Sequence, residues 1–207
     1  MIIGICGGSG SGKTTLLNRI SDAYAYLEPS VFSMDNYYRP IEDQFIDENG
    51  KVNFDLPGAL NEHQLVDDLH KLIAGEEIQV TEYHFNAPPD RKNIITIKPS
   101  KLIIVEGLFL FHFEAVRSVI DFSIFISIHP ETQLKRRIER DTTTRGYSLE
   151  NIMYQWEHHV IPCYNNYLLP YLSVADFNFR NDENADYDFK LLIEEIDKRL
   201  ETVEVKK

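Results

Sequence analysis

The chain has 207 residues, 43% of them hydrophobic and 26% charged, which is the composition of an ordinary globular protein. Its 21 basic and 33 acidic residues give a net charge of −12. This excludes a general binder of nucleic acid polymers or of anionic membranes, because both need an excess of Lys and Arg. With two cysteines, no secretory signal and no apolar stretch near the roughly 18 residues of a membrane span, the sequence predicts a reduced, cytoplasmic protein.

The first predicted elements are a strand, a glycine-rich loop and a helix. Apolar residues 2–6 predict a buried strand, and the apolar spacing after Lys13 predicts a helix to about Tyr26. Between them the sequence matches G-x-x-x-x-G-K-[ST], a loop whose backbone N–H groups surround a phosphate at the positive end of a helix. Lys13 can reach the β and γ phosphates of ATP or GTP, and the Thr14 hydroxyl can bind Mg²⁺. The residues predicted to hold the nucleotide are Gly7, Gly8, Ser9, Gly10, Ser11, Gly12, Lys13, Thr14 and Thr15.

The rest of the chain alternates between strands and helices. Strands are predicted over residues 30–34, 101–107, 120–128 and 175–180, and helices over 61–74, 131–144, 185–201 and from about 148. Residues 36–60 carry turn signals and are expected to be irregular, whereas 78–85 and 94–97 alternate like the strands of a hairpin. Together with the loop, this predicts the three-layer α/β fold of P-loop proteins, with helices on both faces of a mostly parallel five-stranded sheet. We expect one domain over 1–207, with the hairpin inserted at about 78–98.

Two acidic residues follow buried strands and are expected beside the phosphate loop. They are Asp35 and Glu106, and ligands bind at the carboxyl ends of the strands in such a sheet. An acid at Glu106 can hold Mg²⁺, directly or through water, although it could instead cap the next helix. Asp35 is predicted to orient an acceptor hydroxyl and to take its proton late in phosphoryl transfer. The alternative for Asp35 is an N-cap of the segment that follows it.

A basic cluster stands out in this acidic chain. The stretch 135–146 holds five basic and two acidic residues, and Arg136 and Arg140 would repel each other at four-residue spacing on a helix. Clustered arginines suit an anion between them, which predicts a helical lid that closes over ATP at about 135–148. A solvated helix is the alternative.

Aromatic residues gather in the irregular segment and in the hairpin. Tyr37, Tyr38, Tyr83 and Phe85 could enclose a nucleobase, with Asn53 and Asp55 available for the sugar hydroxyls. Each aromatic residue taken alone is more often a packing residue. The set as a whole favours a pocket for a base and its sugar.

With these segments in place, the chain resembles the uridine/cytidine kinase family of phosphate-loop kinases over most of its length. The matching segments are 7–15, 33–39, 53–57, 83–85, 104–107, 140–141 with 145–146, and Gln155. The phosphate loop is shared by many enzymes, whereas Asp-x-x-Tyr at Asp35 and Asn-Phe-Asp-x-Pro at 53–57 are much more specific. The resemblance implies ATP-dependent phosphorylation of the 5′-hydroxyl of uridine or cytidine to the monophosphate, a reaction of pyrimidine salvage. It also implies an oligomer, as a dimer or tetramer.

The resemblance implies roles for individual residues. Asp35 becomes the catalytic carboxylate that faces the nucleoside 5′-hydroxyl, and Arg140 becomes part of the lid; with Lys13 they form the predicted catalytic set. Asp55 and Arg137 are implied to hold the ribose. The residues implied to bind the nucleoside are Tyr38, Asp55, Tyr83, Phe85, Arg137 and Gln155. The Mg²⁺ site predicted from the loop motif and the strand-end acid consists of Thr14 and Glu106.

Two residues depart from the family pattern. Pro88 stands where the family usually has a His that touches the pyrimidine, and Tyr147 stands where many members have Arg. Because a proline side chain cannot donate that hydrogen bond, the acceptor could instead be nicotinamide riboside, pantothenate or ribulose 5-phosphate. Two further classes are disfavoured. A GTP-binding switch would need an N-K-x-D stretch, which is missing, and a degenerate non-catalytic member would have lost Lys13 or Asp35, which are present.

Overall fold

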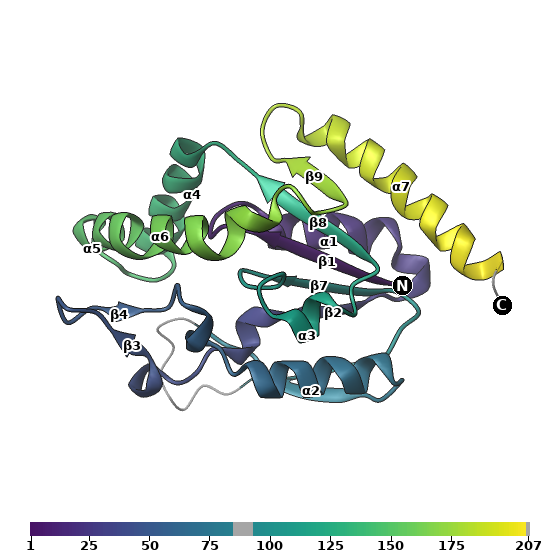
Figure 1. Cartoon of the computed structure of the whole chain (residues 1–207), viewed down its shortest axis with the longest axis horizontal. Coiled ribbons are helices and arrows are strands. Elements are labelled where there is room, and N and C mark those ends of the chain that lie inside the picture. The colour runs from purple at the N-terminus through teal and green to yellow at the C-terminus, as the bar shows by residue number, and fades with distance from the viewer. Residues whose placement is uncertain (85–92, 206–207) are drawn as a thin grey trace.

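The computed structural model of the chain describes residues 1–84 and 93–205 (Figure 1). At its centre is a five-stranded sheet in which all neighbouring strands run parallel, in the order β2-β7-β1-β8-β9. These strands are β1 (Ile2–Gly7), β2 (Ser30–Ser33), β7 (Ile103–Gly107), β8 (Phe122–Ser127) and β9 (Phe177–Arg180). Helices cover both faces of the sheet, which confirms the predicted three-layer α/β fold.

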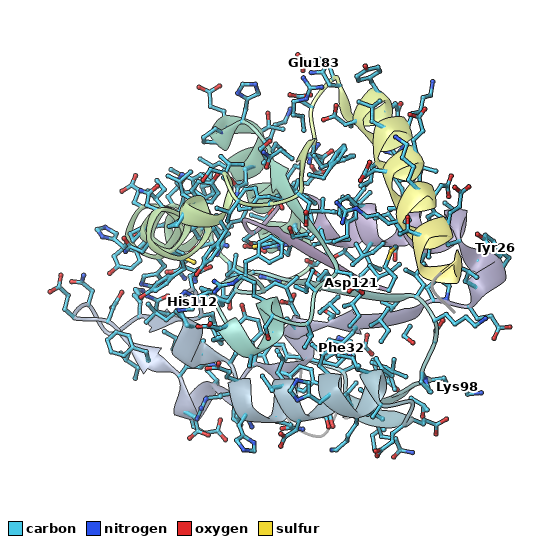
Figure 2. The ribbon with its side chains drawn as sticks, turned by 45° about the vertical axis from the view of Figure 1, so that its right-hand side comes forward. Tyr26, Phe32, Lys98, His112, Asp121 and Glu183 are labelled. Atoms are coloured by element: carbon cyan, nitrogen blue, oxygen red, sulfur yellow. The ribbon has the colours of Figure 1, made fainter. Side chains whose placement is uncertain are left out.

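Both faces of the sheet are buried under helices. Successive side chains of the central strand point to opposite faces, so each face contributes to its own apolar cluster. Ile3 and Ile5 of β1 belong to an apolar cluster with α1 (Lys13–Ala23) and α7 (Ala185–Val205). Ile2 of the same strand belongs to a second cluster, which includes the buried residues of α2 (Glu62–Ile73). Phe32 of β2 lies on this second side, next to α2 (Figure 2). The core therefore consists of two apolar layers with the sheet between them.

The helix predicted to start near Ser148 is present, but it is not a regular α-helix throughout. Ser148 caps it by accepting a hydrogen bond from the Asn151 N–H at 3.3 Å. Its parts are α5 (Leu149–Gln155), the π-helical η5 (Trp156–Val160), α6 (Ile161–Cys163), the π-helical η6 (Tyr164–Leu168) and the 3₁₀ turn η7 (Leu169–Tyr171). Pro162 has no N–H for the bond that an α-helix would make to the His158 carbonyl, and the wider π register occurs at this place.

Residues 36–60 are not irregular throughout, which corrects the expectation from sequence. They contain a small antiparallel hairpin of β3 (Phe45–Ile46) and β4 (Val52–Asn53). Three 3₁₀ turns surround it: η2 (Met34–Tyr37), η3 (Ile41–Asp43) and η4 (Pro57–Ala59). The tip of the hairpin is organised by Asp47, whose Oδ1 accepts the N–H groups of Asn49 at 2.9 Å and Lys51 at 2.8 Å. Such short strands give no alternation in the sequence, so only the turn signal at Asn49-Gly50 could be recognised.

The second hairpin is confirmed, although its first strand is shorter than expected. β5 (Ile78–Thr81) and β6 (Ile94–Ile97) pair antiparallel in a separate two-stranded sheet. The first strand ends at Thr81 and not at residue 85, and the Tyr83 N–H donates to Asn36 Oδ1 at 3.2 Å. This bond ties the chain to η2. Phe85 and Pro88 lie outside the described residues.

The other helix boundaries lie close to those that the apolar spacing predicts, with two differences. The last helix, α7, extends to Val205, beyond residue 201, and the other difference is in α1. This helix ends at Ala23, earlier than Tyr26, and the 3₁₀ turn η1 (Ala25–Leu27) follows. The buried Tyr24 marks the end, where its hydroxyl donates to Asp197 of α7 at 2.8 Å. The remaining helices are α3 (Glu114–Arg117) and α4 (Pro130–Thr143). Within the described ranges, no helix combines the length and the apolar character that a bilayer crossing demands.

Candidate active site

The phosphate loop connects β1 to α1 and has a left-handed backbone at two glycines. These are Gly10, with φ 80°, and Gly12, with φ 99°, which is the N-cap of α1. The Ser11 N–H donates to the Gly8 carbonyl at 3.0 Å, and Lys13 Nζ donates to the same oxygen at 3.4 Å. Lys13 therefore lies against the loop at the positive end of the α1 dipole.

Side chains from distant parts of the chain hold this loop in place. Gln133 of α4 donates to the Ser9 carbonyl at 2.7 Å, and Asn181, which follows β9, donates to the Ser11 carbonyl at 2.6 Å. A Cβ atom added at Gly12 would collide with the Asn181 amide. The tight approach of these side chains, together with the backbone angles, leaves room for glycine alone at this position.

The two acids predicted at strand ends lie beside the loop. In the sheet register Glu106 of β7 is paired with Ser33 of β2, whose hydroxyl donates to Glu106 Oε1 at 2.8 Å. Asp35 follows in η2, and the N-cap of this turn is Ser33 and not Asp35. Both acids line one cleft with Lys13. The Asp35 carboxylate accepts no hydrogen bond from the residues that the structure describes, so it is available to a ligand.

Glu106 has the environment of a metal-binding carboxylate. It is buried, and its Oε2 has no hydrogen-bond partner within residues 1–84 and 93–205. Burial raises the pKa of Glu106 to about 7, and the negative charge of Asp35 acts in the same direction. Mg²⁺ is usually bound by one or two carboxylates together with substrate phosphates, and an unpaired buried carboxylate oxygen suits it. Thr14, which also lines the cleft, adds a hydroxyl, so the residues present fit this ion.

Glu106→Gln should stabilise the metal-free protein at alkaline pH. The pKa of Glu106 is higher in the folded protein than in the unfolded chain, so protonation of Glu106 favours the folded state. This contribution to the free energy of unfolding is fully present below about pH 4.5, the usual pKa of the group. It is lost as the pH rises through about 7. A rise in pKa from 4.5 to about 7 corresponds to about 3 kcal/mol. Urea unfolding without metal should show the variant more stable than wild type at about pH 8, with little difference at about pH 5.

The control for that measurement is Glu139→Gln, which removes an exposed carboxylate from α4. This variant should follow wild type at both pH values. If Glu106→Gln were equally stabilised or destabilised at both pH values, the raised pKa of Glu106 would be wrong.

Three arginines converge on one carboxylate. Asp141 of α4 is fully buried, and its oxygens lie 2.7 Å from Arg140 Nε, 3.3 Å from Arg137 Nε and 3.4 Å from Arg145 Nη1. All three arginines line the cleft. Burial lowers the pKa of Arg145, and the charge of Arg140 lowers it further. The predicted basic cluster is therefore present, and the anion at its centre is the carboxylate of Asp141.

Arg137 joins the loop to the long helix. Its Nη1 donates to Ser9 Oγ at 3.0 Å, and its Nη2 donates to Gln155 Oε1 of α5 at 2.8 Å. Arg140 Nη2 also donates to Ser9 Oγ, at 3.3 Å. The arginines thus reach from the phosphate loop to the residue that the family resemblance places near the sugar.

The end of the cleft away from the loop is aromatic and acidic. The ring of Tyr38 lies 6.0 Å from that of Phe54 and 5.4 Å from that of Tyr83, measured between ring centroids. Tyr38, Phe54 and the buried Asp55 line the cleft, whereas Tyr83 packs against Tyr38 and is not among the described lining residues. Burial raises the pKa of Tyr38 well above its usual value, and the negative charges of Asp35 and Asp55 add to the effect.

Most of the predicted site residues meet in this one cleft, which has a volume of about 440 Å³. Those that line it are Ser9, Gly10, Gly12, Lys13, Thr14, Thr15, Asp35, Tyr38, Asp55, Glu106, Arg137, Arg140 and Gln155. Gly7, Gly8 and Ser11 belong to the loop but are not among the described lining residues. Phe85 lies outside the described part of the chain.

The lining also includes residues that the predicted site set lacks, and for two of them the sequence held a usable signal. Asn181 directly follows β9, so the strand-end rule that selects Asp35 and Glu106 selects it as well. His159 lies one helical turn after Gln155 on the same helix. Because Gln155 was a predicted site residue, a residue four positions later on the same helix was expected to face the same way, and this reasoning would have found His159.

Comparisons with known proteins point to one family. The model of the "Phosphoribulokinase / Uridine kinase family" matches residues 2–188. The chain is 38% identical over 178 residues to the uridine kinase of Borrelia duttonii (strain Ly), covering 84% of each protein. It is 28% identical over 199 residues to uridine kinase-like protein 5 of Arabidopsis thaliana, covering 96% of this chain and 43% of that protein. The solved phosphoribulokinase from Rhodobacter spheroides shares the fold, with a TM-score of 0.63 at 17% identity over 86% of this chain and 69% of that one.

Proposed function

The chain belongs to the phosphoribulokinase/uridine kinase family and is a kinase, and we propose that it transfers the γ-phosphate of ATP to the 5′-hydroxyl of uridine or cytidine. The observation that carries this proposal is the position of Asp35. Its carboxylate accepts no hydrogen bond from the described residues and shares a cleft with Lys13 of the phosphate loop. An acceptor hydroxyl bound by Asp35 would lie beside the phosphate that the loop holds. The reaction class follows from this pairing of a phosphate cradle with a carboxylate.

The proposed chemistry depends on charge placed before the substrates arrive. Asp35 orients the 5′-hydroxyl and accepts its proton late in the transfer. Lys13 and Arg140 stabilise the negative charge that develops on the transferred phosphoryl group. Since Ser9 accepts a hydrogen bond from Arg140 already, this arginine is held at the loop without a ligand. Closure of the segment 135–148 over the nucleotide would exclude water, in the manner of a lid.

We assign Mg²⁺ to Thr14 and Glu106. The unpaired Oε2 of Glu106 and its raised pKa of about 7 support the assignment, because a cation there would satisfy the oxygen and favour the ionised form. When bound, the ion neutralises phosphate charge and orients the phosphates. The neighbouring Asp35 remains free to act on the acceptor.

The acceptor end of the cleft suits a nucleoside. Asp55 and Gln155 can bind sugar hydroxyls, and Tyr38 offers an aromatic surface for a base. Phe54, at the same end, adds a second ring. Arg137 holds Gln155 in position through the bond at 2.8 Å, and its other terminal nitrogen is engaged by Ser9, so we assign it to orientation of the sugar site.

The test is ADP release with Mg-ATP and a panel of acceptors at equal concentration. The panel contains uridine, cytidine, adenosine, nicotinamide riboside, pantothenate and ribulose 5-phosphate. Uridine or cytidine should give the highest rate. Inert pyrimidines beside a rapid turnover of another acceptor would overturn the proposed substrate while leaving the kinase chemistry intact. Lys13→Ala, assayed in parallel, controls for a contaminating kinase.

A further inference from the structure

The β3–β4 hairpin is fastened to the long helix by side chains that are about 100 residues apart in the sequence. Asp47, at the hairpin tip, has its Oδ2 at 2.7 Å from both His159 Nε2 and the Tyr154 hydroxyl. A second bond joins Asn49 Nδ2 to the same hydroxyl at 2.8 Å. Figure 1 shows β3 and β4 next to α5 and α6, at the end of the molecule toward which the central strands point.

The contact between Asp47 and His159 is largely shielded from solvent and has a defined direction. The side chain of His159 is 2% exposed and that of Asp47 is 14% exposed. Burial acts to raise the pKa of Asp47, but the hydrogen bonds from Lys51, Tyr154, His159 and Asn49 together bring it below its usual value. A carboxylate can only accept, so His159 Nε2 carries the proton and donates it. Charge-assisted bonds of this kind are stronger than neutral ones.

The two fastened segments carry opposite walls of the acceptor end of the cleft. Val52, Phe54 and Asp55 come from the hairpin and the residues after it, whereas Gln155 and His159 come from the helix. The distance between the two walls depends on the contacts that join the segments, and the partly buried bonds of Asp47 to Tyr154 and His159 lie at that junction. None of these contacts touches the phosphate loop.

We propose that Asp47 and His159 form a latch that positions the acceptor end of the cleft. By fastening the hairpin to the helix, the pair keeps Asp55 and Gln155 at the separation that a bound sugar requires. The latch rests on the proposed assignment of this end to the acceptor, and it applies to whichever acceptor the enzyme phosphorylates. Without the latch, the two walls would be correctly spaced for a smaller part of the time. The apparent affinity for the acceptor would fall in proportion to the fraction of molecules in which the walls are correctly spaced.

The sharpest test is Asp47→Asn. The turn amides of Asn49 and Lys51 need an acceptor, so the new side chain keeps its oxygen toward them and turns its amide toward the helix. That amide cannot accept from His159 or Tyr154. The hairpin turn is therefore kept, whereas the charge-assisted bonds of the latch are lost and only neutral bonds donated by the amide can replace them. Tyr154→Phe is a milder variant that removes one donor and keeps the ring.

We expect the KM for the acceptor to rise about tenfold in Asp47→Asn, which corresponds to the loss of one hydrogen bond to a charged group. The KM for ATP and kcat should change less than about twofold. Combined with His159→Phe, the variant should show little further loss, because both substitutions break the same contact. The acceptor used is the one that gives the highest rate in the panel, so a wrong substrate assignment does not affect the outcome.

Lys51→Ala is the matched control. Lys51 Nζ donates to Asn151 Oδ1 at 3.3 Å between the same two segments, but this contact is exposed. Exposed pairs contribute little, so the KM for the acceptor should stay at the wild-type value. Two results would overturn the latch: an unchanged KM for the acceptor in both Asp47→Asn and Tyr154→Phe, or an equal rise in the KM for ATP. Additive losses in the double variant with His159→Phe would also contradict it.

Discussion

Replacing Asp35 by Asn should lower kcat by about 10²–10⁴-fold, the usual contribution of a general base. The amide can still contact the acceptor hydroxyl, but it cannot accept a proton from it. The phosphate loop is left intact, so ATP should bind as in wild type. Steady-state kinetics for kcat and calorimetric titration with ATP separate the two effects.

The control for this variant is Asp43→Asn, which changes an exposed carboxylate in η3 outside the cleft. It should keep the wild-type rate. A near-normal kcat in Asp35→Asn would refute the proposed role of Asp35. Since Asp35 also raises the pKa of Glu106, the variant should in addition lower the pH at which Glu106 ionises.

Replacing Lys13 by Ala should lower kcat/KM for ATP by about 10²–10³-fold, the usual loss when one preorganised donor to developing charge is removed. The loop should keep its shape, because Lys13 contributes a single long bond of 3.4 Å to the Gly8 carbonyl. The bonds from Gln133 and Asn181 remain. Thermal unfolding should therefore differ little from wild type, so that the loss of activity is not a loss of fold.

Lys135→Ala is the matched control, because Lys135 is an exposed lysine of α4 and is not a described lining residue of the cleft. Its kcat/KM for ATP should equal that of wild type. Were Lys13→Ala also to keep the wild-type kcat/KM, the loop would not be the site of the γ-phosphate.

The sequence was sufficient for the features that depend on local pattern. A buried strand, a glycine loop and a helix start are each encoded within a few residues, and the parallel sheet then brings the ends of its strands together. This is why the nearness of Asp35 and Glu106 to the loop was predictable without coordinates. Asn181 obeys the same rule at the end of β9, and consistent use of the rule would have included it.

Features that depend on contacts between distant segments were not predictable. Nothing in the local sequence shows that Arg137 donates to both Ser9 and Gln155, or that Asp141 is the common partner of three arginines. The β3–β4 hairpin is stabilised by Asp47 and its partners on the helix, and its two-residue strands have no recognisable period. The π-helical stretches were also missed, because an apolar spacing does not distinguish the π from the α register.

The arginine cluster around Asp141 also affects how a nucleotide arrives. With a net charge of −12, the protein as a whole repels a polyanion such as ATP at long range. At physiological ionic strength charges are screened beyond about 8 Å, so most of the acidic surface has little influence on a nucleotide at the mouth of the cleft. The charged lining of the cleft consists of five basic residues, four of them arginines, and three acidic ones: Lys13, Arg136, Arg137, Arg140 and Arg145 against Asp35, Asp55 and Glu106. The rate of capture is thus set by the local field of these arginines and not by the sign of the whole molecule.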